Sequence, residues 1–474
     1  MSLGLLILPN ASYLNRKRSI MSKSNILCIL FCLLANPLVM SQDLHFPAKH
    51  WMSYDKAADA GFDELQLAEV KQQFEKQGGS TMFVVQAGKV VVAWGSPDRR
   101  YLQASIRKSY LSALFGIFAE EGQIDLQQNL ESLAIDDIQA LTSTEKKAKI
   151  IDLLRAKSGI YLPAAFSPKG MAKYLPARGS HDPGTFWYYN NWDFNALSTI
   201  FQQQTQQDLF TAFHKRIAAP LQMEDFRLFD TYYRFEKDKS IHPAYLFKMS
   251  ARDMARFGLL FLRAGKWKSE QLIPAEWVTE STRVHTAELG RGFQGRGGYG
   301  LLWWIAPPID GNTLYYASGS GGQRLYVIPE QDMVIVHLVD TYQNQDVADE
   351  AILSLVKRLL KAKTKEANSK ANLETLAVPE QQKTQALDLV AAKQLIGEYQ
   401  HPFLKKVGIA LQEKDLILQT GVGTFKLSPM GQNQYLIEDI QIPIVFEAGE
   451  VAQKGTSRSV VNDQRIVEKV IFYY

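Results

Sequence analysis

The sequence predicts an α/β (α+β) fold, in which an antiparallel sheet is flanked by helices, carries a helical subdomain and is followed by a small all-β domain. Two patterns predict this arrangement. The long first segment has strand-like runs near both of its ends, with amphipathic helical runs between and after them. The last segment, residues 387–474, has short strand-like runs separated by turn residues. Regularly spaced short strands of that kind are typical of a small barrel or sandwich.

The strands of the first segment are predicted at its two ends. Residues 82–94 have the pattern of a hairpin with Gly88 and Lys89 at the turn. Later strands are predicted over residues 313–317, 325–328 and 333–339. Residues 346–361 repeat apolar side chains at helical spacing. We therefore expect a mixed sheet whose first and last strands pair with each other.

The excess positive charge of the chain lies in its first 41 residues. The 474 residues carry 53 Lys and Arg against 49 Asp and Glu, a net charge of +4. The first 41 residues hold four of the bases and no acid, so the remainder carries 49 of each. Cys28 and Cys32, the two cysteines, lie there too. A neutral, cysteine-free remainder lacks the electrostatic signature of a nucleic-acid binder. It also cannot form a disulfide framework, a thiolate zinc site or a Cys nucleophile.

Residues 1–41 are predicted to be a secretory signal peptide. Basic residues precede an apolar run over residues 25–40, which is too short for a membrane span of about 20 apolar residues. Synthesis from Met21 instead of Met1 would give a compact leader of the same kind. We expect a periplasmic or secreted protein with no stable membrane span after cleavage. An N-terminal membrane anchor is the alternative.

The rest of the chain is predicted to divide into three parts. Residues 43–362 form the main domain, and residues 363–386 are polar and weakly patterned, as in a linker. Residues 387–474 form the small all-β domain. No chemistry is evident in that last part.

One of four S-x-x-K motifs stands apart from the others. Ser105 and Lys108 open a helix whose following turns are largely apolar. Residues three apart share one face of a helix, so Lys108 is expected beside the Ser105 hydroxyl. The helix N-terminus and burial both lower a lysine pKa, and a neutral amine can take the serine proton. A plain helix cap is the alternative role for Ser105.

A Tyr-Asn-Asn triplet that follows a Pro-Gly turn is the second candidate element. The hydroxyl of Tyr189 can relay a proton between serine and the leaving group. Asn191 can hydrogen-bond a substrate amide. The alternative is an aromatic core cluster made of Trp187, Tyr188 and Trp192.

Together these segments resemble the serine β-lactamase and penicillin-binding-protein superfamily, within it the class C-related serine hydrolases, which include esterases and amide hydrolases. The likeness covers about residues 80–360. Ser105 and Lys108 match the S-x-x-K motif of the family, and Tyr189 and Asn191 match its Y-x-N motif. Further similar stretches are residues 151–159, 250–260 and 299–304. The resemblance implies a β-lactamase/transpeptidase-like fold, with serine as nucleophile, lysine as base and tyrosine as proton relay.

The third motif departs from the family pattern. The family has K-T-G or H-x-G, whereas residues 317–323 of this chain contain neither Lys nor His. In the family that cation binds the carboxylate of β-lactams and D-Ala-D-Ala peptides. Its absence therefore argues against β-lactamase and DD-peptidase activity more strongly than against serine hydrolysis itself. Gly321 allows close backbone approach. The Ser320 N–H is expected to hold the oxyanion with the Ser105 N–H, which makes Ser320 and Gly321 substrate-binding residues.

The expected function is an exported serine hydrolase that cleaves an ester or amide through an acyl-enzyme on Ser105, without metal or cofactor. The expected substrate is a small-molecule ester or amide, or a peptide-like molecule, and nucleic acid is not expected. One alternative is a β-lactamase or DD-peptidase proper; another is a catalytically weak sensor that binds peptidoglycan fragments or β-lactams. The oligomeric state stays open. Four tryptophans are expected either to line an aromatic cleft or to pack in the core: Trp187, Trp192, Trp303 and Trp304.

Overall fold

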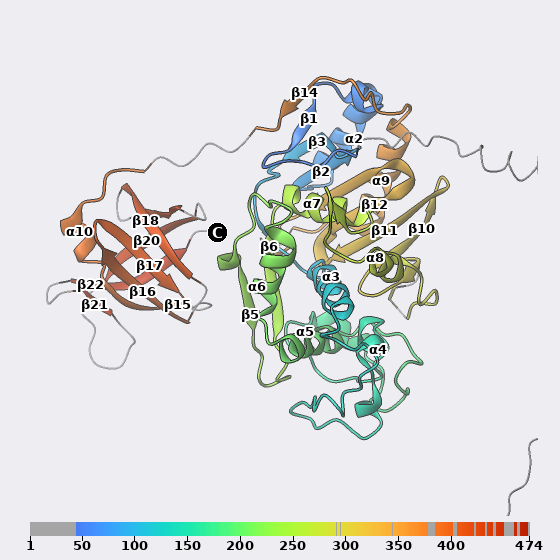
Figure 1. The fold of residues 1–474 in the computed structure, drawn as a ribbon, viewed down its shortest axis with the longest axis horizontal. Coiled ribbons are helices and arrows are strands. Elements are labelled where there is room, and N and C mark those ends of the chain that lie inside the picture. The colour runs from blue at the N-terminus through green and yellow to red at the C-terminus, as the bar shows by residue number, and fades with distance from the viewer. Residues whose placement is uncertain are drawn as a thin grey trace, which may run out of the picture. The chain divides into compact units, whose positions relative to one another are not determined.

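The first part of the chain forms a nine-stranded sheet (Figure 1). The computed structural model describes residues 44–290, 292–293, 295–343, 345–377, 384–401, 405–420, 423–431, 434–438, 442–449, 459–461 and 465–472. The strand order is β14-β1-β3-β2-β13-β12-β11-β10-β9. Neighbours are antiparallel except β1 and β3, which are parallel. The strands are β1 (Met52–Tyr54), β2 (Thr81–Gln86), β3 (Lys89–Gly95), β9 (Gly298–Tyr299), β10 (Trp304–Ile309), β11 (Asn312–Gly319), β12 (Gln323–Ile328), β13 (Met333–Leu338) and β14 (Leu373–Thr375).

The predicted pairing between the early and late strands is confirmed. Strand β2 lies antiparallel to β13, with Val84 opposite Ile335. The hairpin of β2 and β3 turns at Ala87 and Gly88, one residue earlier than predicted. Both turn residues have positive φ, 50° and 76°, as two-residue hairpin turns require.

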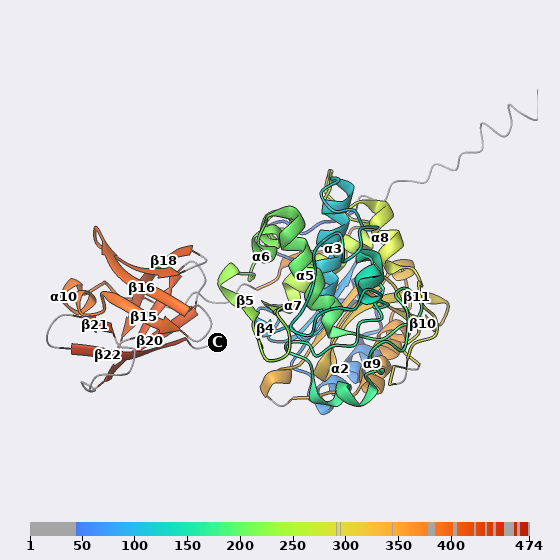
Figure 2. The ribbon, with the colours of Figure 1, turned by 90° about the horizontal axis from the view of Figure 1, so that it is seen from below.

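Helices cover both faces of this sheet. Helix α7 (Ala251–Leu262) packs on β13 at Gly258, where an added Cβ would lie 2.6 Å from a Val334 methyl group. Val334 and His337 are three residues apart on one strand, so they point to opposite faces. The His337 ring contacts Phe74 of α2 (Glu64–Lys76) at 5.8 Å between centroids. Helices α2 and α9 (Asp349–Ala362) therefore cover the face opposite α7 (Figure 2).

Helix α3 (Arg107–Glu120) is buried on every side along its first twelve residues. A helix without a polar face belongs in the interior. The Ser109 and Ser112 hydroxyls donate to the Leu302 and Leu301 carbonyls, at 2.9 and 2.7 Å. These bonds satisfy two buried polar groups and attach α3 to the segment before β10. Helices of the helical subdomain and its surroundings are α4 (Ile150–Leu154), α5 (Asn191–Thr205), α6 (Leu209–Phe213) and α8 (Ala275–Thr282). Short strands beside them are β4 (Tyr101–Leu102), β5 (Thr231–Arg234), β6 (Ala244–Met249), β7 (Lys266–Trp267) and β8 (Glu270–Gln271).

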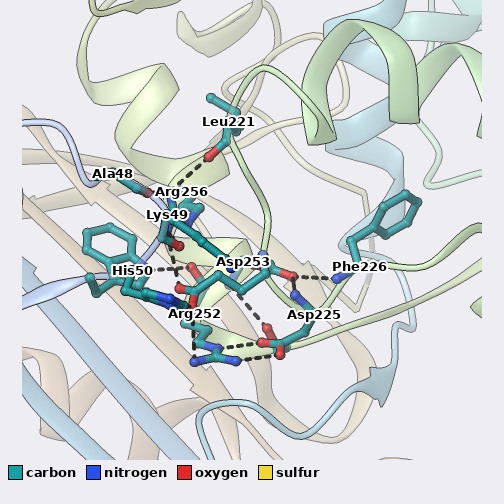
Figure 3. Close-up of polar contacts among 12 residues, drawn as sticks. Ala48, Lys49, His50, Leu221, Asp225, Phe226, Arg252, Asp253 and Arg256 are labelled. Atoms are coloured by element: carbon teal, nitrogen blue, oxygen red, sulfur yellow. Dashed lines mark hydrogen bonds and ion pairs between the residues drawn. The ribbon is translucent and has the colours of Figure 1, made fainter. Parts of the chain in front are cut away.

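A buried charge network attaches α7 to two distant parts of the chain (Figure 3). Arg252 donates two 2.6 Å hydrogen bonds to the carboxylate of Asp225. The Asp253 carboxylate accepts three backbone N–H bonds from residues 224–226, at 2.7 to 2.8 Å. Arg256 donates to the backbone carbonyls of Ala48, Lys49 and Leu221. The family-like stretch 250–260 therefore has a structural role, because each of its buried charges has partners.

The C-terminal part of the chain forms a separate eight-stranded antiparallel sheet, which confirms the small all-β domain. Its order is β15-β16-β17-β18-β19-β20-β22-β21. The strands are β15 (Gly397–His401), β16 (Lys405–Gln412), β17 (Asp415–Thr420), β18 (Gly423–Gly431), β19 (Gln434–Ile437), β20 (Ile442–Gly449), β21 (Ser459–Val461) and β22 (Arg465–Phe472). A short helix, α10 (Leu389–Lys393), precedes them. Its core includes Leu416, Leu418, Ile437 and Ile444.

Two further sequence predictions concern the ends of the main domain. Strand β14 lies within the predicted linker, 363–386, and pairs with β1, so the first sheet extends past residue 362. The predicted signal peptide, residues 1–41, lies outside the described residues. Among the helices that the structure does describe, none is both long and apolar enough to cross a membrane.

Candidate active site

The structure brings Ser105 and Lys108 together as predicted. Ser105 lies immediately before α3, and Lys108 lies in its first turn. The Lys108 Nζ and Ser105 Oγ atoms are 2.8 Å apart, within hydrogen-bond distance. A base this close to the hydroxyl can take its proton as the oxygen attacks a carbonyl.

The surroundings of Lys108 favour its neutral form. The residue is 2% exposed, and its Nζ lies 5.0 Å from the ring centroid of Tyr189 and 4.8 Å from that of Phe194. No carboxylate among the described residues forms an ion pair with it. Burial lowers the pKa of Lys108 well below its ordinary value, and the nearby charge of Arg107 lowers it further. The amine is therefore suited to act as a base near neutral pH.

Tyr189 faces the same serine. Burial raises the pKa of Tyr189 to about 12, while a hydrogen bond with the Ser105 side chain acts in the opposite direction. The phenol consequently keeps its proton at neutral pH and can donate it to a leaving group. The rings of Phe194, Phe293 and Trp304 lie 4.9 to 5.4 Å from the Tyr189 ring and fix its position.

Asn191 lines the same pocket at the start of α5. Its Nδ2 donates to Ser167 Oγ at 3.2 Å. The preceding residue, Asn190, caps α5 and donates to the Ile160 carbonyl at 2.5 Å and to Asp193 at 2.7 Å. These bonds hold the turn on which both Tyr189 and Asn191 stand.

The glycine-rich segment after β11 reaches the pocket as predicted, and Ser320 and Gly321 both line it. Gly321 has φ +77°, and an added Cβ would lie 2.3 Å from Thr341 Oγ1, so a larger residue does not fit. An added Cβ at Gly319 would lie 3.2 Å from the Cβ of Ala104, the residue before Ser105. This close approach places the Ser320 backbone beside the nucleophile.

The pocket contains a cation beside the third motif, which the sequence analysis did not expect. Arg296 Nη1 donates to Ser318 Oγ at 3.2 Å, and both residues line the pocket. Its other terminal nitrogen pairs with Asp349, which also pairs with Arg324. Arg296 and Arg324 therefore lie beside the third motif, which itself contains neither Lys nor His. The residue-by-residue match could not show this, because Arg296 is remote from the motif in sequence.

The four tryptophans have different positions. Trp304 lines the pocket, and its ring lies 5.2 Å from the Arg296 guanidinium. Trp187, Trp192 and Trp303 are buried in the core and are absent from the pocket lining. The aromatic cleft therefore includes one of them, and the core alternative holds for the other three. The whole pocket has a volume of about 880 Å³.

Comparisons with known proteins place this chain in a family. A family model described as Beta-lactamase matches residues 67–357, and the chain belongs to that family. Similar solved structures include a class C β-lactamase from Rhodobacter sphaeroides, with 16% identity over 63% of this chain and 99% of that chain and a TM-score of 0.46. An octameric penicillin-binding protein homologue from Pyrococcus abyssi has 16% identity over 85% of this chain and 99% of that chain, with a TM-score of 0.47. No curated protein matches the chain. The protein is thus a β-lactamase-related serine hydrolase, as its motifs predict.

Proposed function

We propose that this protein is exported and cleaves an ester or amide through an acyl-enzyme on Ser105. The observation that carries the proposal is the 2.8 Å separation between Ser105 Oγ and the buried Lys108 Nζ. A lysine that served only to cap or pack a helix would not need to be buried beside a serine hydroxyl. The export step rests on the pattern of residues 1–41 alone.

The reaction follows from the positions of the side chains. Neutral Lys108 takes the Ser105 proton as Oγ bonds to the substrate carbonyl, and the backbone N–H groups of Ser105 and Ser320 hold the resulting oxyanion. Tyr189 donates its proton to the leaving alcohol or amine as the carbonyl bond to that group breaks, and protonated Lys108 returns a proton to the Tyr189 phenolate. Water then attacks the acyl-enzyme and releases the acid, which restores the serine hydroxyl.

A panel of substrates tests this proposal. Purified protein should hydrolyse a chromogenic short-chain ester or an aryl amide, and Lys108→Ala and Tyr189→Phe should both lower kcat/KM by at least about a hundredfold. Lys147→Ala is the matched control, because this lysine is exposed and does not line the pocket. Equal activity in Lys108→Ala and the unchanged protein would contradict the proposal.

One observation favours a second candidate, a β-lactamase or DD-peptidase. Arg296 beside Ser318 gives the pocket a cation where a substrate carboxylate could bind. Rapid opening of a chromogenic cephalosporin by the unchanged protein, with a loss of at least about tenfold in Arg296→Gln, would support this candidate. A stable acyl-enzyme without turnover would instead favour the sensor alternative.

A further inference from the structure

An arginine inside the S-x-x-K motif has no carboxylate partner among the described residues. Arg107 lies between the nucleophile and the base in sequence, is 3% exposed and lines the pocket. Its Nε and Nη1 atoms are buried without a hydrogen-bond partner, and it takes part in no ion pair of the described residues. Its guanidinium lies 4.5 Å from the ring centroid of Tyr245. A buried cation without a counter-ion costs free energy, so this arrangement favours the binding of an anion.

A second cation and two aromatic rings line the same pocket as Arg107. The rings of Phe166 and Tyr342 stack with centroids 5.8 Å apart, and the Arg234 guanidinium lies 4.8 Å from the Phe166 centroid. Burial raises the pKa of Tyr342, and the charges of Arg107 and Arg234 both oppose that shift. Arg107, Arg234, Phe166 and Tyr342 all line the pocket.

The acidic side chains that line the pocket are too few to balance its basic side chains. Glu236 pairs with Arg234 at 3.1 Å and with Lys239 at 2.6 Å, so one carboxylate serves two bases. Over the whole pocket lining there are six Lys and Arg against three Asp and Glu. The chain after residue 41 is neutral, which makes this concentration of positive charge a property of the pocket. Such a cleft attracts anionic ligands.

We propose that Arg107, Arg234, Phe166 and Tyr342 form a subsite for an anionic group of the substrate, so that the enzyme prefers esters or amides with a free carboxylate. This subsite is made of other residues than the part of the pocket at β11, where Arg296 contacts Ser318. Arg107 and Ser105 line the same pocket, so one substrate molecule can place its carboxylate at the subsite and its carbonyl at the nucleophile. The substrate preference rests on the proposed hydrolase function, whereas anion binding can be measured without turnover.

Two 4-nitrophenyl esters of glutaric acid test the preference. One has a free terminal carboxylate, and the other has a neutral terminal amide of the same length. The unchanged protein is expected to have a kcat/KM at least about tenfold higher for the charged ester. In Arg107→Gln and Arg234→Gln this ratio should fall to about one to three, and Arg107→Lys should recover part of it. Lys147→Gln, which removes an exposed charge outside the pocket, should keep the full ratio.

Calorimetric binding of glutarate is the second measurement, and it does not depend on turnover. Glutarate should bind the unchanged protein at least about tenfold more tightly than it binds Arg234→Gln, whose side chain is 49% exposed and tolerates substitution. Equal kcat/KM for the two esters, or full preference and glutarate affinity in Arg234→Gln, would overturn the subsite. A protein that binds glutarate but hydrolyses neither ester would overturn the proposed hydrolase function and support the subsite.

Discussion

The Gln323 side chain accepts a 2.9 Å hydrogen bond from the backbone N–H of Ala104, the residue before the nucleophile. Its Nε2 donates to the Leu102 carbonyl, also at 2.9 Å. Gln323 is fully buried and begins β12, directly after the turn that contains Ser320. The Gln323 side chain therefore fixes the position of the segment before Ser105 relative to the glycine-rich turn.

Replacing Gln323 should reduce activity by displacing the turn from the nucleophile. In Gln323→Leu, the Ala104 N–H and the Leu102 carbonyl lose their buried partner, and each loss costs about 1 to 3 kcal/mol in the free energy of unfolding. Ester kcat/KM should fall at least about tenfold. Gln72→Leu, at an exposed position, is the control. Unchanged kcat/KM and unchanged stability in Gln323→Leu would refute this role.

The rate of Ser105 modification should depend on the protonation of Lys108. Burial and the charge of Arg107 lower the pKa of Lys108, so the neutral, active amine exists well below pH 10.5, the ordinary value for lysine. As the pH falls through the lowered pKa, the amine is protonated and the rate should decline. Stopped-flow measurements of fluorophosphonate labelling against pH check this expectation.

The Arg107→Gln variant should shift the acidic limb of that pH profile in a defined direction. Removing the neighbouring positive charge raises the pKa of Lys108, so the acidic limb should move to higher pH. Arg107→Lys keeps the charge and should leave the limb closer to its original position. A limb that moves to lower pH in Arg107→Gln would contradict the assignment of the limb to Lys108.

The buried network on α7 should contribute strongly to stability. In Arg252→Leu, Asp225 loses two 2.6 Å hydrogen bonds and remains buried without its counter-ion, which costs about 3 to 5 kcal/mol. Arg283→Leu removes an ion pair with Glu280 whose side chains are 53% and 40% exposed, so it should cost less than about 1 kcal/mol. Urea unfolding measures both values. Equal losses in the two variants would show that burial of the network does not matter.

Local patterns in the sequence were sufficient to predict much of the site. Ser105 and Lys108 are three residues apart on a helix, and Tyr189 and Asn191 share one turn, so each pair follows from short-range geometry. The hairpin over β2 and β3 and the amphipathic helix α9 were predictable for the same reason. Helix α9 runs over Asp349–Ala362, close to the predicted 346–361.

The remaining features depend on contacts between distant segments. Arg296 reaches Ser318 across 22 residues, from a glycine-rich loop whose sequence did not indicate this contact. Arg107 lies within the S-x-x-K motif, but only the structure shows that two of its nitrogen atoms are buried without a hydrogen-bond partner. Strand β14 is short and polar, so its sequence is typical of a linker. It forms a strand because it pairs with β1, a contact that the local sequence does not show.

The central claim is that Ser105 is the nucleophile, and intact-protein mass spectrometry after treatment with a fluorophosphonate tests it most directly. We expect one added phosphonyl group in the unchanged protein, located at Ser105 by peptide mapping, and none in Ser105→Ala. Ser109→Ala should still be labelled, because its hydroxyl is buried and bonded to the Leu302 carbonyl. Labelling of Ser105→Ala to the same extent as the unchanged protein would show that Ser105 is not the nucleophile.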